Sequence, residues 1–161
     1  SFSLAPEVEA IVKRLIFGTG ANIPGVVNLA PDAMLPGMED LRLAPIACLF
    51  TSADAAAGDD PVAAAKFAAK HLPLVKEQYV FELIVSRPAF FSLLEEERYA
   101  LIYNGLLHCG RDEKGKWTIR EADYKGFEVH VRHFGLTDRR ARGMAMQMSL
   151  FKSTAAMKRI Q

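Results

Sequence analysis

The sequence has few of the features that mark secreted, membrane or nucleic-acid-binding proteins. It contains only two cysteines, Cys48 and Cys109, in 161 residues, which is too few for a disulfide framework and is typical of reduced thiols in a cytoplasm. No apolar run is long enough to cross a bilayer, and no basic segment followed by an apolar stretch indicates a signal peptide. The net charge of +1 gives no overall attraction to nucleic acid or to a membrane surface. We therefore expect a cytoplasmic protein without a membrane partner.

The sequence does contain enough apolar material for one well-filled core. Half of the residues are hydrophobic, and a chain of this length suits a single domain. Apolar residues spaced by three and four predict helices, and short β-branched or aromatic runs predict strands. The predicted helices cover residues 6–17, 61–72, 88–109, 123–134 and a final stretch from 139, and the predicted strands cover 45–51, 79–85 and 117–119. Residues 18–42 form a long irregular connection, whose length favours a functional loop over a plain linker.

Two residues conflict with the elements in which they stand. Glu82 lies in the middle of the best predicted strand, and we interpret it as an exposed position on an edge strand. Gly105 lies in the interior of the long predicted helix, where glycine costs about 1 kcal/mol relative to alanine. Either the helix ends early, or something compensates for that cost, such as a close backbone approach by another element.

The stretch 103–109 in this helix has the frame of a zinc-peptidase motif. The motif His-Glu-x-x-His places two imidazoles four residues apart on one helix face, where both bind one metal ion, and its glutamate activates the metal-bound water. This chain has Asn104, Gly105 and His108 in those three positions. The frame is present, but the first ligand and the base are absent.

The surroundings of this stretch extend the likeness. It follows the strand at residues 79–85 (Tyr-Val-Phe-Glu-Leu-Ile-Val) and precedes a turn with Gly115 and Trp117, and then residues 122–127 (Ala-Asp-Tyr-Lys-Gly-Phe). Over residues 1–136 the chain resembles the phage metallopeptidases, whose pattern is a strand, a helix with His-Glu-Leu-x-His, a hairpin and His-Asp-x-x-x-Phe. The resemblance implies an α+β, zincin-like fold with a short mixed or antiparallel sheet packed on helices. It also implies a metallopeptidase-like domain at 1–136 and a basic C-terminal helical extension at 137–161, in one compact unit.

The same resemblance places the chemical positions of the family on particular residues. The three zinc ligands fall on Asn104, His108 and Ala122, and the water-activating glutamate falls on Gly105. Only His108 is retained. One imidazole cannot supply the three protein ligands of a catalytic zinc ion, and glycine cannot act as a base. We therefore expect a pseudoenzyme with no catalytic residue, no metal site and no cofactor.

A zinc site built from other ligands is the alternative that the sequence leaves open, and it would make the chain an active metallohydrolase. Its candidates are His108, Asp123, His130 and His133. A partly exposed polar edge is the more common reason for a pair such as His130 and His133, and hydrogen bonding to neighbouring backbone is the more common reason for a helix-end His108. Cys109, at the predicted end of the helix, meets the unfavourable end of the helix dipole, so we do not predict a nucleophile there.

Residues 136–161 are basic and contain one acid. We take five of their side chains as candidate binding residues: Arg139, Arg140, Arg142, Lys158 and Arg159. A solvated helix face is the simple explanation of this charge, and contact with nucleic acid or an acidic protein is the functional one. No aromatic residues lie between the arginines, so base stacking is not indicated. A DNA-associated protein is therefore a second alternative.

The predicted function combines the phage resemblance with the lost chemistry. We expect a catalytically inactive protein that binds a host protein or a protein–nucleic-acid complex in the host cytoplasm. Inhibition of a host defence system, such as an anti-CRISPR role, is the hypothesis for that binding. The predicted contact surfaces are the basic tail and the former cleft around Asn104, His108 and Glu82.

Overall fold

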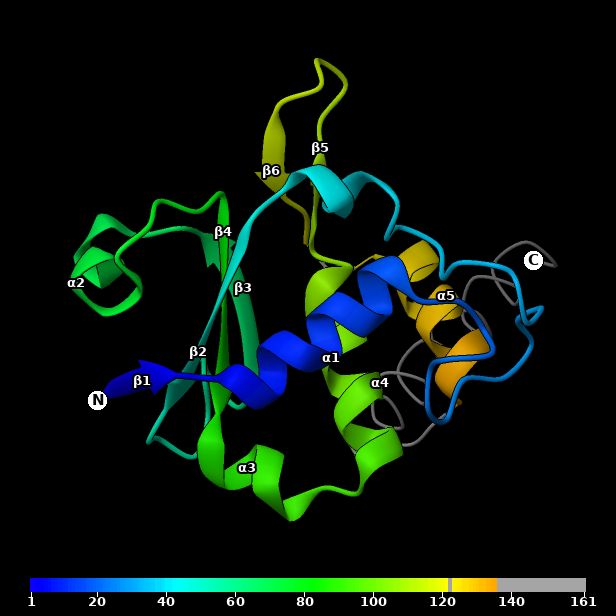
Figure 1. Cartoon of the computed structure of the whole chain (residues 1–161), viewed down its shortest axis with the longest axis horizontal. Helices are drawn as coiled ribbons and strands as arrows, with labels where there is room; N and C mark the ends of the chain where they lie inside the picture. The colour runs from blue at the N-terminus through cyan, green and yellow to red at the C-terminus, as the bar shows by residue number, and fades with distance from the viewer. Residues whose placement is uncertain (122, 136–161) are drawn as a thin grey trace, which may run out of the picture.

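A four-stranded mixed sheet forms one side of the protein in the computed structural model, which describes residues 1–121 and 123–135 (Figure 1). Its strands are β1 (Phe2–Leu4), β2 (Ile46–Thr51), β3 (Val62–Lys66) and β4 (Phe81–Ser86), in the spatial order β1-β2-β4-β3. Strands β2 and β4 run parallel, and each outer strand runs antiparallel to its neighbour. The two central strands are almost wholly buried, in agreement with their apolar sequences.

The helices lie mainly beside one face of this sheet. Helices α1 (Pro6–Phe17) and α4 (Glu95–Leu106) pack together next to the strands, and α5 (Tyr124–Phe134) packs on α4 (Figure 1). The shorter segments are η1 (Asp40–Leu43), η2 (Ala69–His71), α2 (Leu72–Val75) and α3 (Arg87–Ser92), and a hairpin of β5 (Cys109–Arg111) and β6 (Trp117–Ile119) projects from the body. Mixed helices and strands confirm the predicted α+β class.

The first and last described helices follow their sequence signals closely. In α1, the apolar stripe that includes Val8 and Leu15 is buried, and the Gly18 N–H donates to the Arg14 carbonyl at the end of the helix. In α5, Asp123 caps the first turn by accepting a hydrogen bond from the Gly126 N–H at 2.7 Å. Gly135 then ends the helix with a φ of 68°, a conformation that glycine adopts without strain. Both helix predictions are confirmed.

The prediction of a helix over residues 61–72 was wrong. Residues 62–66 form β3, which pairs antiparallel with β4 in a register that places Ala64 opposite Leu83. Alanine favours an isolated helix, but pairing with a buried strand outweighs that propensity of a few tenths of a kcal/mol per residue. The small alanine side chains also leave room for α4, which contacts β3.

The prediction of one helix over residues 88–109 was also wrong. The chain forms α3 and α4 with an extended break at Leu93 and Leu94. Glu97 stabilises the new start, because its Oε1 accepts a hydrogen bond from the Leu94 N–H at 2.9 Å. Helix α4 then ends at Leu106, so His108 and Cys109 lie beyond it.

Glu82 does not lie on an edge strand, because β4 is paired on both sides. Its side chain is only 2% exposed. The prediction of an exposed edge position was therefore wrong, and Glu82 cannot contribute to a contact surface in this conformation.

The predicted final helix and the basic candidates Arg139, Arg140, Arg142, Lys158 and Arg159 lie outside the described residues. The proposed 137–161 extension lies there too. Among the helices of residues 1–121 and 123–135, none is long and apolar enough to cross a membrane.

Candidate functional site

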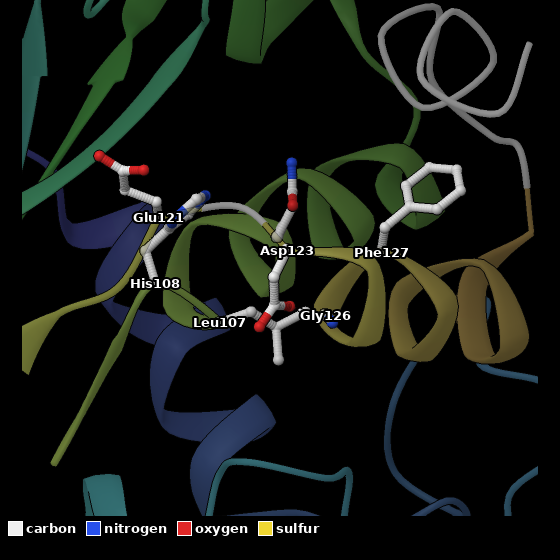
Figure 2. A pocket seen from close by; sticks show the side chains of 7 residues that line it. Leu107, His108, Glu121, Asp123, Gly126 and Phe127 are labelled. Carbon is white, nitrogen blue, oxygen red and sulfur yellow. Dashed lines mark hydrogen bonds between the residues drawn. The ribbon is translucent and has the colours of Figure 1, made fainter. Parts of the chain in front are cut away.

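The end of α4 and the start of α5 enclose a small pocket at the predicted site. It is lined by seven residues: Asn104, Leu107, His108, Glu121, Asp123, Gly126 and Phe127. Figure 2 shows these side chains gathered from the α4–β5 turn and from the beginning of α5. The cavity volume is about 30 Å³, which is room for about one water molecule. The structure thus brings Asn104, His108 and Asp123 together, as the sequence predicts, although the space they share is very small.

His108 is held in a defined orientation at the turn between α4 and β5. Its Nδ1 lies 2.7 Å from the carbonyl oxygen of Arg120, and the Arg120 N–H donates in return to the His108 carbonyl at 2.7 Å. Because a carbonyl oxygen can only accept, Nδ1 carries the proton in this contact. In the neutral ring, Nε2 therefore keeps its lone pair free. Metal-ligating histidines are commonly oriented by the same kind of contact.

The acidic residues of the pocket do not converge on His108. Asp123 uses Oδ1 to cap α5, and Figure 2 shows its carboxylate and that of Glu121 pointing away from each other. Asn104 contributes a neutral amide. Ala122, the expected third ligand position, lies outside the described residues, although both of its chain neighbours line the pocket.

Gly105 faces the sheet rather than open space. A Cβ built on this residue would lie 2.8 Å from Val62 Cγ2 and 2.9 Å from Leu83 Cδ1, which is closer than real Cβ atoms approach. Side chains of β3 and β4, rather than backbone, therefore approach this residue closely. The helix also ends early, because α4 stops one residue later at Leu106. The position that would carry the general base is filled by the packing of α4 on the sheet.

The whole arrangement has a counterpart among known families. A family model described as Putative phage metallopeptidase matches residues 1–149. The chain belongs to this family. No curated protein and no solved structure matches it. For this phage metallopeptidase family member, the resemblance seen in the sequence is confirmed, and two of the ligand positions inferred from it, Asn104 and His108, line the pocket.

The described residues of this family member do not fit a zinc ion. A catalytic zinc ion needs three protein ligands with lone pairs directed at one point. The pocket supplies one imidazole, one neutral amide and two carboxylates that diverge. Within residues 1–121 and 123–135, no group of three or more His, Cys, Asp or Glu side chains is arranged to hold a metal ion.

The other two histidine candidates serve to dock α5. His130 is 2% exposed, and its Nε2 lies 2.9 Å from the Ala100 carbonyl oxygen of α4. His133 is 4% exposed, and its Nδ1 lies 3.0 Å from the Val27 carbonyl oxygen in the long connection. The interpretation of this pair as a partly exposed edge was wrong. The two rings bind different carbonyls on different segments, so they do not face one shared ion.

Neither cysteine is arranged as a nucleophile. Cys109 lies in β5, not at a helix end as expected, and both thiols are buried. Burial raises the pKa of Cys48 and of Cys109 to about 12, since a charged thiolate would be poorly solvated there. Both side chains therefore remain neutral thiols at physiological pH.

Glu82 forms a second polar site, away from the pocket, which the sequence analysis missed. Its Oε1 accepts a hydrogen bond from the Ala68 N–H at 2.6 Å, and its Oε2 lies 2.9 Å from His71 Nδ1. The His71 ring is 5% exposed and packs against Phe2 with ring centroids 4.9 Å apart. The contact at His71 does not meet hydrogen-bond geometry, although the two atoms lie within ion-pair distance. The one sequence signal for this site was an acidic residue within an otherwise apolar strand, which could have indicated a buried polar contact.

Proposed function

We propose that this chain is a metallopeptidase-fold protein without zinc chemistry, and that it acts by binding a host protein. Inhibition of a host defence system is the role we propose for that binding, since the family is one of phage proteins. The observation that carries the proposal is the packing at Gly105. A catalytic base at this position would need a side chain where Val62 and Leu83 already lie, and a glycine has no rotamer that could provide a carboxylate there.

The pocket volume supports the same proposal. A peptidase has to hold an extended peptide and a water molecule beside its metal ion. The pocket beside His108, at about 30 Å³, is too small for a peptide, so its described lining residues do not form a substrate cleft.

Metal analysis tests the loss of zinc chemistry. We expect the full chain, purified without added zinc, to contain far less than one zinc ion per chain when it is measured by inductively coupled plasma mass spectrometry. A double variant, Asn104→His with Ala122→His, restores the inferred ligand set and is expected to bind zinc. Stoichiometric zinc in the original chain that disappears in His108→Ala would overturn the proposal.

An active hydrolase with non-standard ligands is the second candidate function. The favouring observation is His108, whose contact with Arg120 leaves Nε2 available as a ligand, in a pocket that also contains Glu121 and Asp123. The metal analysis separates the two candidates, because this one requires zinc in the original chain. Zinc retained in His108→Ala would exclude this site as its location.

Capture from a host lysate, followed by mass spectrometry, tests the proposed binding. The charge-reversed triple variant Arg139→Glu, Arg140→Glu and Arg142→Glu tests the basic tail, and Lys114→Glu in the exposed hairpin turn is the matched control. A partner lost only in the triple variant supports binding through the tail. Unchanged capture by the triple variant would remove the tail from the proposal. Capture of DNA instead of protein, with steep salt dependence, would favour the DNA-associated alternative.

A further inference from the structure

The α3–α4 corner is a surface with exposed apolar residues and charges of both signs. It consists of five residues from the start of α3 to the start of α4: Arg87, Phe91, Leu94, Glu95 and Glu96. Phe91 is 42% exposed and Leu94 is 68% exposed. Such exposure of two neighbouring large apolar side chains is a common feature of protein contact surfaces.

Two guanidinium groups lie close to the Phe91 ring. The Arg87 Cζ lies 5.0 Å from the ring centroid, and the Arg98 Cζ lies 5.3 Å from it. Arg98 is fixed further by its Nε, which donates to the Phe90 carbonyl at 3.0 Å. Aromatic rings with arginines are the residue types that most often carry interface energy.

The charges at this corner are not neutralised within the described part of the chain. The ion pairs among those residues are Lys13–Glu9 and His71–Glu82, so neither Arg87 nor the carboxylates of Glu95 and Glu96 have such a partner there. Arg98, three residues after Glu95, turns back over the Phe90 and Phe91 rings instead. Positive and negative side chains on both sides of an apolar centre are therefore available to an oppositely charged surface.

A hollow beside the arginine completes the surface. It is lined by Ser52, Arg87, Pro88 and Phe91 and has a volume of about 360 Å³. The exposed Leu94 is a side chain of suitable chemistry to enter such a hollow, and it belongs to the same corner. A two-fold dimer requires that one surface supply both the projecting side chain and the hollow that receives it.

We propose that the α3–α4 corner binds the same corner of a second copy of this chain. In the dimer, Leu94 of each copy enters the hollow of the other, and Arg87 of each copy faces Glu95 and Glu96 of the other. The acidic run in the first turn of α4 disfavours a nucleic-acid backbone at this surface, since it would repel phosphates. The proposal does not depend on the proposed function.

Charge reversal tests this dimer without knowledge of any other partner. Sedimentation equilibrium of the full chain is expected to show a dimer. Arg87→Glu alone, and Glu95→Arg with Glu96→Arg alone, are each expected to weaken the dimer at least about tenfold, because like charges then meet twice in each pair. Lys114→Glu makes the same kind of change in the hairpin turn and is expected to leave the dimer intact.

Mixing the two charge-reversed chains gives the decisive result. In the mixed dimer, the glutamate introduced at position 87 faces the arginines introduced at 95 and 96, and the original Arg87 faces the original glutamates. Both contacts are then complementary, so association is expected to return. Urea unfolding of each variant checks that it is folded. The proposal would be overturned if the original chain stayed monomeric at the highest concentration reached. It would also be overturned if the mixture of the two variants stayed monomeric. Either result would be expected if another segment or another protein covered the corner.

Discussion

The pocket beside His108 and the Glu82–His71 pair both contain polar side chains, but the fold depends on them to different degrees. The pocket residues are partly exposed or capping groups, and their hydrogen bonds are local to the α4–β5 turn and the start of α5. Glu82 is 2% exposed in a central strand and binds the Ala68 N–H from a distant segment. The residues that resemble an active site are therefore the less essential ones for stability.

This difference follows from solvation. A partly exposed histidine that loses a partner can bond to water, whereas a buried carboxylate that loses its partners cannot. In this chain the burial of a polar side chain, rather than its place in a motif, indicates how much stability depends on it.

The largest predicted effect compares these two regions directly. Glu82→Ala removes the acceptor of the Ala68 N–H and leaves His71 buried without its partner, and we expect a loss of about 3 kcal/mol in the free energy of unfolding. His108→Ala removes one contact at a partly exposed turn, and we expect a loss of about 1 kcal/mol. Urea unfolding monitored by circular dichroism measures both.

Glu82→Gln serves as the matched control for this comparison. The glutamine keeps an oxygen for the Ala68 N–H but removes the charge beside His71, so its effect should lie between the other two. Equal destabilisation by Glu82→Ala and His108→Ala would break the distinction between the two regions.

Substitutions on the two sides of α4 are predicted to change the free energy of unfolding by less than Glu82→Ala does. Gly105→Ala brings a methyl group against Val62 and Leu83, and overpacking of about 1–3 kcal/mol is offset in part by the gain of about 1 kcal/mol in helix propensity. We expect a net loss of about 1 kcal/mol by urea unfolding. Asn104→Ala, on the pocket side of the same helix, is expected to change stability by less than about 0.5 kcal/mol.

A double-mutant cycle checks the cause of the Gly105 effect. In a Val62→Ala background the new methyl group has more room, so Gly105→Ala should be less destabilising than in the original chain. An unchanged cost in that background would show that Val62 is not the obstacle.

The sequence was sufficient where a local signal determined the structure. Asp123 and Gly135 were recognised as the two ends of α5, and the compensated Gly105 was recognised as a site of close approach. The pocket around His108 was also anticipated, because the order of its residues along the chain matches a known pattern.

The sequence was insufficient where a distant segment decides the outcome. The alanines of β3 form a strand because β4 is available as a partner, and this pairing has no local signature. The burial of Glu82 depends on the Ala68 and His71 segment folding over it. His130 and His133 are buried because carbonyls of Ala100 and Val27, far away in the chain, receive them.

Ionisation of the buried thiols is predicted to have the smallest effect on the free energy of unfolding at neutral pH, since their effect develops only above about pH 9. Burial raises the pKa of Cys109 from 9.0 to about 12, so the unfolded chain loses this proton at lower pH than the folded chain. The resulting stability is fully present below about pH 9 and is lost as the pH rises toward about 12. Cys48 and Tyr103, whose pKa values burial also raises, contribute in the same direction.

Urea unfolding in the range from about pH 8 to about pH 11 tests this linkage. Stability should fall with rising pH, and Cys109→Ala should make the fall shallower by removing one of the contributing groups. Ser92→Ala is the control, because this exposed hydroxyl donates only to the Ala89 carbonyl, which does not titrate, and the slope is expected to stay unchanged. A slope that is identical in Cys109→Ala and the original chain would show that this thiol does not titrate differently in the two states.

The contact of Gly105 with Val62 and Leu83 also restricts the order in which this lineage can change. A mutation that introduces glutamate at position 105 meets the sheet before any zinc ligand is in place, so selection acts on its cost alone. Smaller residues at 62 or 83 would make room for that side chain, but both positions are buried, so the smaller residues would themselves lower stability. The residue at position 105 is therefore coupled to the residues at 62 and 83, and a change at any one of them alters the cost of a change at the others.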